Sequence, residues 1–349
     1  MVVDPDRWHV PTRAMLRTEA DLDLFGQCFA INGSPRPADH LRWQYLDNPT
    51  GELFVDFALA RNDKLAAIYA SMPVTFRIAG QRRLGIQSVD TMTDSEFRGR
   101  GLFLTLARQT YARARDAGVA LVYGTPNANS AHGFFNRLDW SELGDLPFLI
   151  RPLRTKYFLE RLGAPWTPDL PIPVGWRSRR ATSVDRFDER FTELWRQFSR
   201  TIGVAVERDA RYLNWRLVEK PSERYETNAI FDGDRVRAFT SHCVQKKERS
   251  AVGYVMESLC LPGEQRALRG LLRTCLVDMA KQEVDFALAW CFPHSPTYSS
   301  FLRCGFVPLP RRMWPLEIHV GAHAFAPDVS TYVTDRRHWY LSYVDCDTV

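Results

Sequence analysis

The residues from Ile86 to Leu106, IQSVDTMTDSEFRGRGLFLTL, contain the transition that decides the fold of this chain. Residues 86–93 are rich in β-branched side chains and predict a strand, which the polar residues 94–96 end. After the basic run Arg98-Gly99-Arg100-Gly101, apolar residues recur at helical spacing from Leu102 until Gly118, which is expected to end the helix. The stretch therefore predicts a strand, a basic glycine-containing loop and a helix in succession.

The loop before this helix has the properties of an anion-binding site. Glycines at positions 99 and 101 let the backbone approach a ligand closely, since they carry no Cβ atom. The first N–H groups of a helix lack intrahelical partners, and the helix dipole favours an anion there by roughly 0.3–1 kcal/mol at an exposed site. A pyrophosphate fits such a place. The alternative is a solvated structural turn.

Arg98-Gly99-Arg100-Gly101 resembles the acyl-CoA-binding signature of the GNAT N-acetyltransferase superfamily, Arg/Gln-x-x-Gly-x-Gly/Ala, in which Arg98 and Gly101 match and Phe103 replaces the last small residue. The resemblance implies acetyl-CoA or another acyl-CoA as co-substrate. It implies that the cofactor-binding residues are Thr91, Met92, Thr93, Arg98, Gly99, Arg100, Gly101, Leu102, Phe103, Asn127, Asn129 and Ser130.

Residues 127–140, NANSAHGFFNRLDW, resemble the next helix of that family, which has an asparagine near its start and ends in Tyr-x-x-x-Gly-Phe. Phe135 stands in the position of the tyrosine, and Asp139-Trp140 replaces Gly-Phe. The predicted helices and strands from about residue 15 to 153 follow the GNAT order, so the resemblance covers a whole domain.

Length and composition indicate an ordinary globular protein. The 349 residues allow two or three domains, and 45% hydrophobic and 25% charged residues suggest neither disorder nor membrane residence. A net charge of +5 without a concentrated basic stripe argues against a nucleic-acid partner. No apolar run approaches the roughly 18 residues of a membrane span, and the first residues have no signal pattern. We expect a cytoplasmic monomer or homodimer.

The seven cysteines, at positions 28, 243, 260, 275, 291, 304 and 346, are odd in number and have no CxxC spacing. A disulfide framework or a zinc site needs paired spacings. The pattern predicts buried, reduced thiols and no metal site.

Four prolines between residues 165 and 173 disfavour a helix and a central strand, so residues 164–180 are predicted to be a stiff linker. Beyond it, Ala38, Leu41, Trp43 and Pro49 recur as Ala210, Leu213, Trp215 and Pro221, each 172 residues later. Residues 262–270 lack the closely spaced glycine pair, so the repeat is not expected to bind CoA. We predict a GNAT domain over 1–163, a degenerate GNAT-like domain over 181–317 and a tail over 318–349 that packs on the second domain or covers a pocket.

The expected fold is therefore α/β. The resemblance implies two tandem GNAT-like domains, each a mixed, mostly antiparallel sheet flanked by helices, with the second degenerate.

Attack of an amine on a thioester requires a neutral amine and a proton for the leaving thiolate. Phe135 has no hydroxyl, and Gln87 stands near the position that commonly carries the family's glutamate base. Asp90 is the only acid within the strand and is the candidate base or amine-orienting group, unless it makes only a structural hydrogen bond. His132 is a second candidate because histidine titrates near neutrality, although a solvent-facing histidine is the plainer alternative. Asn127, Asn129 and Ser130 could bind pantetheine or cap the helix.

The resemblance implies an acyl-CoA-dependent N-acyltransferase, with acetyl as the acyl group, that acts on a small, weakly basic amine such as an amino sugar or metabolite. Its loop and its asparagine-containing helix also resemble bacterial GNAT enzymes. Two alternatives remain open: a Fem-type aminoacyltransferase that uses aminoacyl-tRNA, and a non-catalytic acyl-CoA sensor. The loop disfavours the first, and the missing tyrosine and glutamate favour the second.

Overall fold

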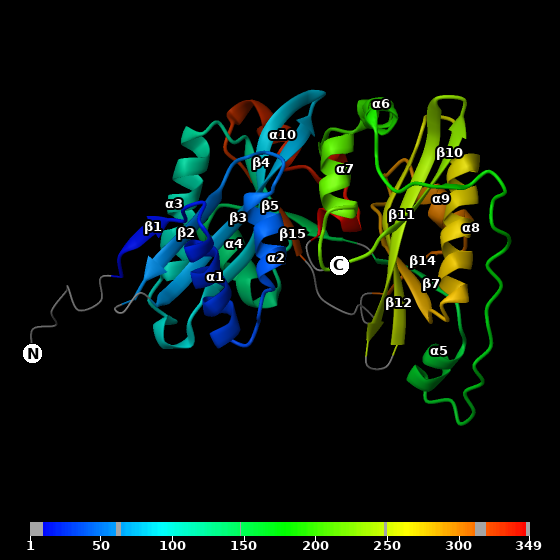
Figure 1. Ribbon diagram of the computed structural model, residues 1–349, viewed down its shortest axis with the longest axis horizontal. Coiled ribbons are helices and arrows are strands. Elements are labelled where there is room, and N and C mark those ends of the chain that lie inside the picture. The colour runs from blue at the N-terminus through cyan, green and yellow to red at the C-terminus, as the bar shows by residue number, and fades with distance from the viewer. Residues whose placement is uncertain (1–9, 61–63, 147, 248–249, 311–318, 347–349) are drawn as a thin grey trace, which may run out of the picture. The chain divides into compact units, whose positions relative to one another are not determined.

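The computed structural model describes residues 10–60, 64–146, 148–247, 250–310 and 319–346. They divide into two compact units. The first contains the described residues of Met1–Phe76, Gln81–Gly144 and Ile318–Arg336, and the second those of Arg77–Gly80, Asp145–Glu317 and Arg337–Val349. Each unit has its own mixed sheet flanked by helices (Figure 1), which confirms the predicted fold class.

The first unit is built on a sheet with the strand order β1-β2-β3-β4-β5-β15-β6. Its elements are β1 (Thr12–Ala14), α1 (Glu19–Ile31), α2 (Ala38–Leu41) with a π-helical turn (Arg42–Leu46), β2 (Phe54–Leu59), β3 (Leu65–Ile78), β4 (Gln81–Thr93), α3 (Leu102–Asp116), β5 (Leu121–Gly124), α4 (Ala128–Arg137), β6 (Ser141–Asp145), β15 (His319–Ala324) and α10 (Ser330–Val333). β2 pairs antiparallel with β3, and β15 antiparallel with β5. β4 and β5 run parallel.

Two hydrophobic clusters lie on the two faces of this sheet because side chains alternate along the strands. On β2, Val55 and Phe57 pack with α1 and α2, whereas Phe54 and Ala58 pack with α3 and α4. The helix predicted to begin at Leu102 begins there, and Gly118 follows its end in the left-handed conformation, φ 76°. The central strand, loop and helix are thus confirmed.

The second unit repeats this plan on a sheet with the order β14-β7-β13-β12-β11-β10-β8. Its elements are β7 (Phe148–Pro152), α5 (Lys156–Arg161), β8 (Thr182–Ser183), α6 (Glu189–Phe198), β9 (Val204–Val206), α7 (Ala210–Leu217), β10 (Glu226–Asp232), β11 (Arg235–Lys247), β12 (Ser250–Cys260), α8 (Gln265–Lys281), β13 (Phe286–Trp290), α9 (Tyr298–Arg303) and β14 (Val307–Pro308). α7 begins at Ala210, the repeat partner of the first residue of α2. The parallel pair β12–β13 corresponds to β4–β5.

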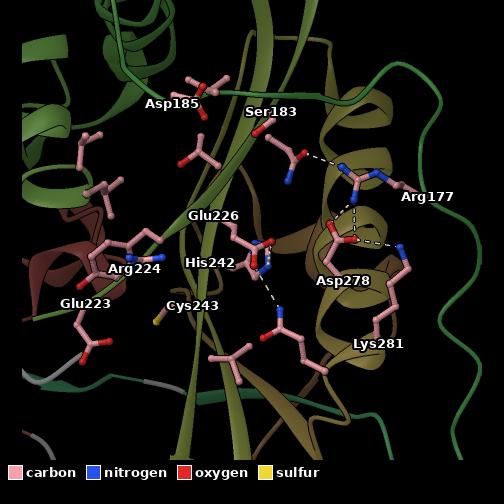
Figure 2. A pocket seen from close by; sticks show the side chains of 18 residues that line it. Arg177, Ser183, Asp185, Glu223, Arg224, Glu226, His242, Cys243, Asp278 and Lys281 are labelled. Carbon is pink, nitrogen blue, oxygen red and sulfur yellow. Dashed lines mark hydrogen bonds and ion pairs between the residues drawn. The ribbon is translucent and has the colours of Figure 1, made fainter.

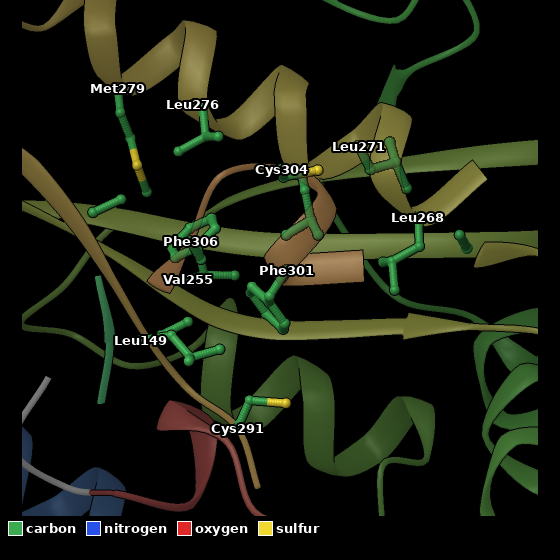
Figure 3. Close-up of a cluster of buried hydrophobic side chains, with 14 of the residues drawn as sticks. Leu149, Val255, Leu268, Leu271, Leu276, Met279, Cys291, Phe301, Cys304 and Phe306 are labelled. Carbon is green, nitrogen blue, oxygen red and sulfur yellow. The ribbon is translucent and has the colours of Figure 1, made fainter. Parts of the chain in front are cut away.

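Figure 3 shows the core of the second unit, where α8 packs on its sheet. Leu268, Leu271, Leu276 and Met279 lie at helical spacing along α8, and all four are buried. Their spacing places them on one face of the helix, which explains why this segment forms a helix that packs on the sheet.

The unit boundaries differ from the predicted domain boundaries at two places. β7, assigned from sequence to the first domain, pairs with β13 in the second sheet. β15, assigned to the tail, pairs with β5 in the first sheet, whereas the residues from Arg337 belong to the second unit. Both strands pair with partners far away in sequence, and the pattern of a single strand does not reveal its partner.

The seven cysteines all lie in the described part of the chain, where they are buried and form no disulfide. Burial raises the pKa of most of these thiols, to about 11 for Cys28. Among the described residues, no helix is long and apolar enough to cross a membrane.

Candidate functional site

The glycine-containing loop lies between β4 and α3. Asp94 ends β4 and accepts a hydrogen bond from the Glu96 amide over 3.0 Å, which starts a short helical turn. Gly99 and Gly101 follow with φ angles of 77° and 74°, in the left-handed region that disfavours other residues. A Cβ atom at either glycine would meet no heavy atom within 4 Å. The backbone conformation explains the glycines, and the space beside them is open.

The N-terminus of α3 opens onto this space. In the described part of the chain no side chain caps α3, whose N-cap residue is Gly101. Two exposed arginines flank it: Arg98 donates to the Thr93 carbonyl over 3.3 Å, and Arg100 donates to the Glu96 carbonyl over 2.9 Å. Uncapped helix N–H groups and two exposed guanidinium groups next to them in sequence are donors of the kind that bind a phosphate.

A cavity of about 220 Å³ lies where the pairing of β4 and β5 ends. The two strands pair from Gly85 with Leu121 to Ser88 with Gly124, after which β5 ends and β4 continues to Thr93. The cavity is lined by Phe29, Ser34, Arg36, Ser88, Val89, Asp90, Thr91, Met92, Gly124, Thr125, Pro126, Asn127, Ser130, Phe134 and Trp140. The fold therefore brings together five of the predicted residues, namely Asp90, Thr91, Met92, Asn127 and Ser130.

The sequence profile of the acetyltransferase (GNAT) domain matches residues 17–143. This range contains the loop, α3 and every residue that lines the cavity. Residues 17–143 are a GNAT acetyltransferase domain. No curated protein sequence matches the chain as a relative.

Solved structures share the fold of almost the whole chain at low sequence identity. N-myristoyltransferase from Saccharomyces cerevisiae with bound myristoyl-CoA is 13% identical, with a TM-score of 0.59 over 89% of this chain and 82% of that one. A GCN5-related N-acetyltransferase from Anabaena variabilis is 12% identical, with a TM-score of 0.61 over 91% and 73%. A protein from Enterococcus faecalis described as a probable N-acyltransferase is 10% identical, with a TM-score of 0.60 over 93% and 74%.

Asp90 lies at the inner wall of the GNAT domain's cavity and is buried. Its Oδ1 accepts from Arg36 Nη2 over 2.8 Å and from Nε over 3.2 Å, and its Oδ2 accepts from Gln44 over 3.1 Å and from the Tyr45 hydroxyl over 2.9 Å. Arg36 also lines the cavity, 5.2 Å from the centre of the Phe29 ring. The carboxylate is thus held rigidly by three side chains.

Other predicted residues lie away from the cavity. His132 is exposed on α4, where Nδ1 is 2.8 Å from the Asn136 amide nitrogen, and it does not line the cavity. Leu102 is buried, and Phe103 packs against the rings of Tyr69 and Phe134 at 5.8 and 5.2 Å. The side chain of Asn129 lies outside the described residues.

Asn127 and Ser130 line the cavity and also start α4, since Asn127 Oδ1 accepts from the Ser130 amide over 3.2 Å. Phe134 lines the cavity, whereas Phe135 stands 6.2 Å from the ring of His319 on β15. Neither ring supplies a hydroxyl, so the GNAT domain lacks a tyrosine acid at this helix.

Sequence reasoning missed a buried chain of hydroxyl groups that ends at the cavity. Tyr69 on β3 donates to Ser88 Oγ over 3.0 Å, and Tyr111 on α3 lies 2.8 Å from the Tyr69 hydroxyl. Burial raises the pKa of Tyr69 to about 12. The residues come from different elements, so no local motif marks them.

A larger hollow, of about 880 Å³, lies in the second unit beside β10 and α8 (Figure 2). Its charged side chains are largely paired with one another: Arg177 contacts Asp278, and Arg177 donates to Asn228 over 3.0 Å. His242 is buried 3.6 Å from Glu226, and burial lowers its pKa. The smaller cavity differs from this hollow in that it is lined by β4, the strand that leads into the glycine loop.

Proposed function

We propose that the chain is an acyl-CoA-dependent N-acyltransferase whose reaction takes place in the cavity between β4 and β5. The observation that carries the proposal is that β4, whose residues 88–92 line this cavity, leads directly into an open, basic loop at a helix N-terminus. The loop would hold the pyrophosphate of CoA, and the thioester would reach the cavity along Thr91 and Met92. Acetyl is the proposed acyl group. The myristoyl-CoA bound by the yeast N-myristoyltransferase supports the co-substrate class.

Catalysis would depend mainly on positioning. Holding the two reactants together can contribute as much as about 7–11 kcal/mol, whereas a general acid or base adds roughly 10²–10⁴-fold. A main-chain N–H of β4, near Thr91–Thr93, would stabilise the oxyanion. A GNAT domain without the usual tyrosine and glutamate can therefore still be an enzyme.

The proposed acceptor is a small, weakly basic amine, such as an amino sugar. A lysine-like amine with a pKa near about 10.4 is about one part in a few thousand neutral at pH 7, and it would need a strong base. An amine with a pKa near about 8 lies only about one pKa unit above pH 7, so a weak base is enough to deprotonate it. Since Asp90 is the only acidic residue among those that line the cavity in the described chain, a weakly basic acceptor fits it better.

Transfer from radiolabelled acetyl-CoA to a panel of amines at pH 7 tests the function. We expect labelled product with an amino sugar such as glucosamine and at least about a hundredfold lower kcat/KM with a lysine-like amine, following the neutral fractions above. Binding of acetyl-CoA without transfer to any amine would instead favour an acyl-CoA sensor. Phe135 and Gln87 are the observations that keep this second candidate in view.

Asp90→Asn is expected to lower kcat at pH 7 by roughly ten- to a thousandfold while the affinity for acetyl-CoA stays within about twofold. The variant removes the negative charge that would orient or deprotonate the acceptor. The defect should shrink above about pH 9, where more of the acceptor is neutral without help. Initial rates between pH 6 and 10, with calorimetric titration of CoA, measure both effects.

Asp56→Asn is the matched control, because Asp56 is also a buried strand aspartate with a guanidinium partner, Arg113, at 2.8 Å. It does not line the cavity, so its variant should lose stability but not kcat. Normal turnover of Asp90→Asn at pH 7, or a loss of CoA binding, would remove Asp90 from the chemistry.

A further inference from the structure

Four side chains of the first unit form a hydrogen-bonded chain that joins two residues of the cavity wall, Trp140 and Ser88, through the buried hydroxyl groups of Tyr111 and Tyr69. Trp140 Nε1 donates to the Tyr111 hydroxyl over 3.0 Å, the Tyr111 and Tyr69 hydroxyls are 2.8 Å apart, and Tyr69 donates to Ser88 Oγ over 3.0 Å. Trp140, Tyr111 and Tyr69 are each no more than 4% exposed. Ser88 is half-buried and lines the cavity.

The direction of the protons along this chain follows from the donors. An indole N–H can only donate, so the Tyr111 oxygen accepts from Trp140. Each phenol has one proton, and Tyr69 uses its proton on Ser88. The bond between the two phenols must therefore use the proton of Tyr111. Every proton along the chain points toward Ser88, and the Ser88 oxygen accepts one, which leaves its own O–H to donate onward.

This direction persists over the working pH range. Burial raises the pKa of Tyr69 to about 12 and that of Tyr111 well above its usual value, so both phenols keep their protons. Linked hydrogen bonds also polarise one another, by perhaps about 10–30% per bond. The hydroxyl of Ser88 is therefore a fixed and strengthened donor.

Ser88 lines the cavity at the place where the pairing of β4 and β5 ends. It is the last residue of β4 that pairs with β5, opposite Gly124. A Cβ atom at position 124 would lie 3.0 Å from the Ser88 carbonyl oxygen and 3.2 Å from the Trp140 ring. Glycine is therefore needed at this position because Ser88 and Trp140 pack closely against it.

We propose that Ser88 is a catalytic residue, whose hydroxyl donates a hydrogen bond to the atom of the thioester that gains negative charge during acyl transfer. Tyr69 is the residue that positions this hydroxyl. The inference rests on the proposed function. The amine nitrogen forms a bond to the thioester carbonyl carbon, the carbon–sulfur bond breaks, and the thiolate leaves with the electron pair. The amine loses one proton, to Asp90 or to solvent, and the thiolate gains one from solvent. Ser88 keeps its proton and donates a hydrogen bond throughout.

Ser88→Ala is expected to lower kcat by about a hundredfold, the usual effect of removing one such donor, with the calorimetric affinity for acetyl-CoA within about twofold. The defect should be constant between pH 6 and 9, since serine does not titrate there. Arg36 and Asp90 are the charged groups that line the same cavity, and both are retained in the variant. Ser88→Thr, which keeps the hydroxyl, should recover most of the lost rate.

Tyr69→Phe should lower kcat by about tenfold, the scale of one hydrogen bond, because the Ser88 hydroxyl is then free to turn away. Ser241→Ala is the control: it removes a buried strand hydroxyl that lies 2.7 Å from Thr227 in the second unit, and kcat should not change.

The outcomes separate the two proposals. Wild-type protein that binds acetyl-CoA but acylates no amine overturns both the proposed function and the role of Ser88. Wild-type turnover with an unchanged kcat in Ser88→Ala overturns the role of Ser88 alone. Two other results for Ser88→Ala would also overturn the role of Ser88 alone. One is a defect that lies entirely in the affinity for acetyl-CoA. The other is a loss of kcat that varies with pH, as the loss of a proton-transfer group would.

Discussion

Gly101→Val is expected to abolish CoA binding, with a loss of at least about a hundredfold in affinity, while the protein stays folded. The new side chain would project into open space, since no heavy atom lies within 4 Å of a Cβ atom there. That space lies beside the first N–H groups of α3, where the pyrophosphate is proposed to bind. The left-handed backbone, φ 74°, adds a strain of about 1–2 kcal/mol, which a folded domain can tolerate.

Gly263→Val is the matched control for this variant. Gly263 precedes α8, has φ 87° and likewise has no heavy atom within 4 Å of a Cβ atom. Calorimetric titration and thermal melting of both variants separate the effects: similar shifts in Tm are expected, with CoA affinity lost only in Gly101→Val. Wild-type protein should bind one CoA per chain. Unchanged CoA affinity in a folded Gly101→Val variant would contradict the assignment of the loop.

Elements with strong local signals could be predicted from the sequence. α3 begins at Leu102, as predicted, after a glycine that the backbone requires. The sheets to which β7 and β15 belong could not be predicted. β7 and β15 each pair with a strand more than 130 residues away, and side-chain periodicity carries no record of such a partner.

The candidate site was predicted only in part, for the same reason. The strand, loop and helix locate Asp90, Thr91 and Met92 at the cavity, because these residues follow one another on β4. Ser88 lies on the same strand but has no distinguishing neighbours in sequence. The proposed role of Ser88 as a hydrogen-bond donor depends on Tyr69 and Tyr111, which lie on β3 and α3.

In the second unit, described side chains pack at the end of the corresponding parallel strands. β12 and β13 pair as far as Val255 with Ala289, and Glu257 lies just beyond. The last described residues of the chain fill this place: the Tyr340 hydroxyl donates to Glu257 over 2.5 Å, and Tyr343 stacks on Trp290 with ring centres 4.3 Å apart. This packing gives a physical reason to expect only one CoA per chain.

Arg208→Ala is expected to lower the free energy of unfolding of the second unit by about 3–5 kcal/mol, because it leaves buried carboxylates without their cation. Arg208 is fully buried, with Nε 2.9 Å from Glu257 and Nη2 2.5 Å from Asp345. Denaturant unfolding measures the loss. The exposed pair Arg186–Glu219, at 2.8 Å, supplies the control: Arg186→Ala should change stability by no more than about 1 kcal/mol.

The pH dependence of the Arg208→Ala defect provides a further check. Burial raises the pKa of Asp345 above its usual value even beside Arg208, whose charge acts to lower it. Without Arg208 this pKa rises further, so the folded variant binds a proton that the unfolded chain releases near about pH 4. The contribution of such a group to stability falls as pH rises from the unfolded pKa through the folded one. The loss of unfolding free energy in Arg208→Ala should therefore be smaller at pH 5 than at pH 8. A deficit that grows on acidification, or one below about 1 kcal/mol at pH 8, would mean that Arg208 does not stabilise these carboxylates.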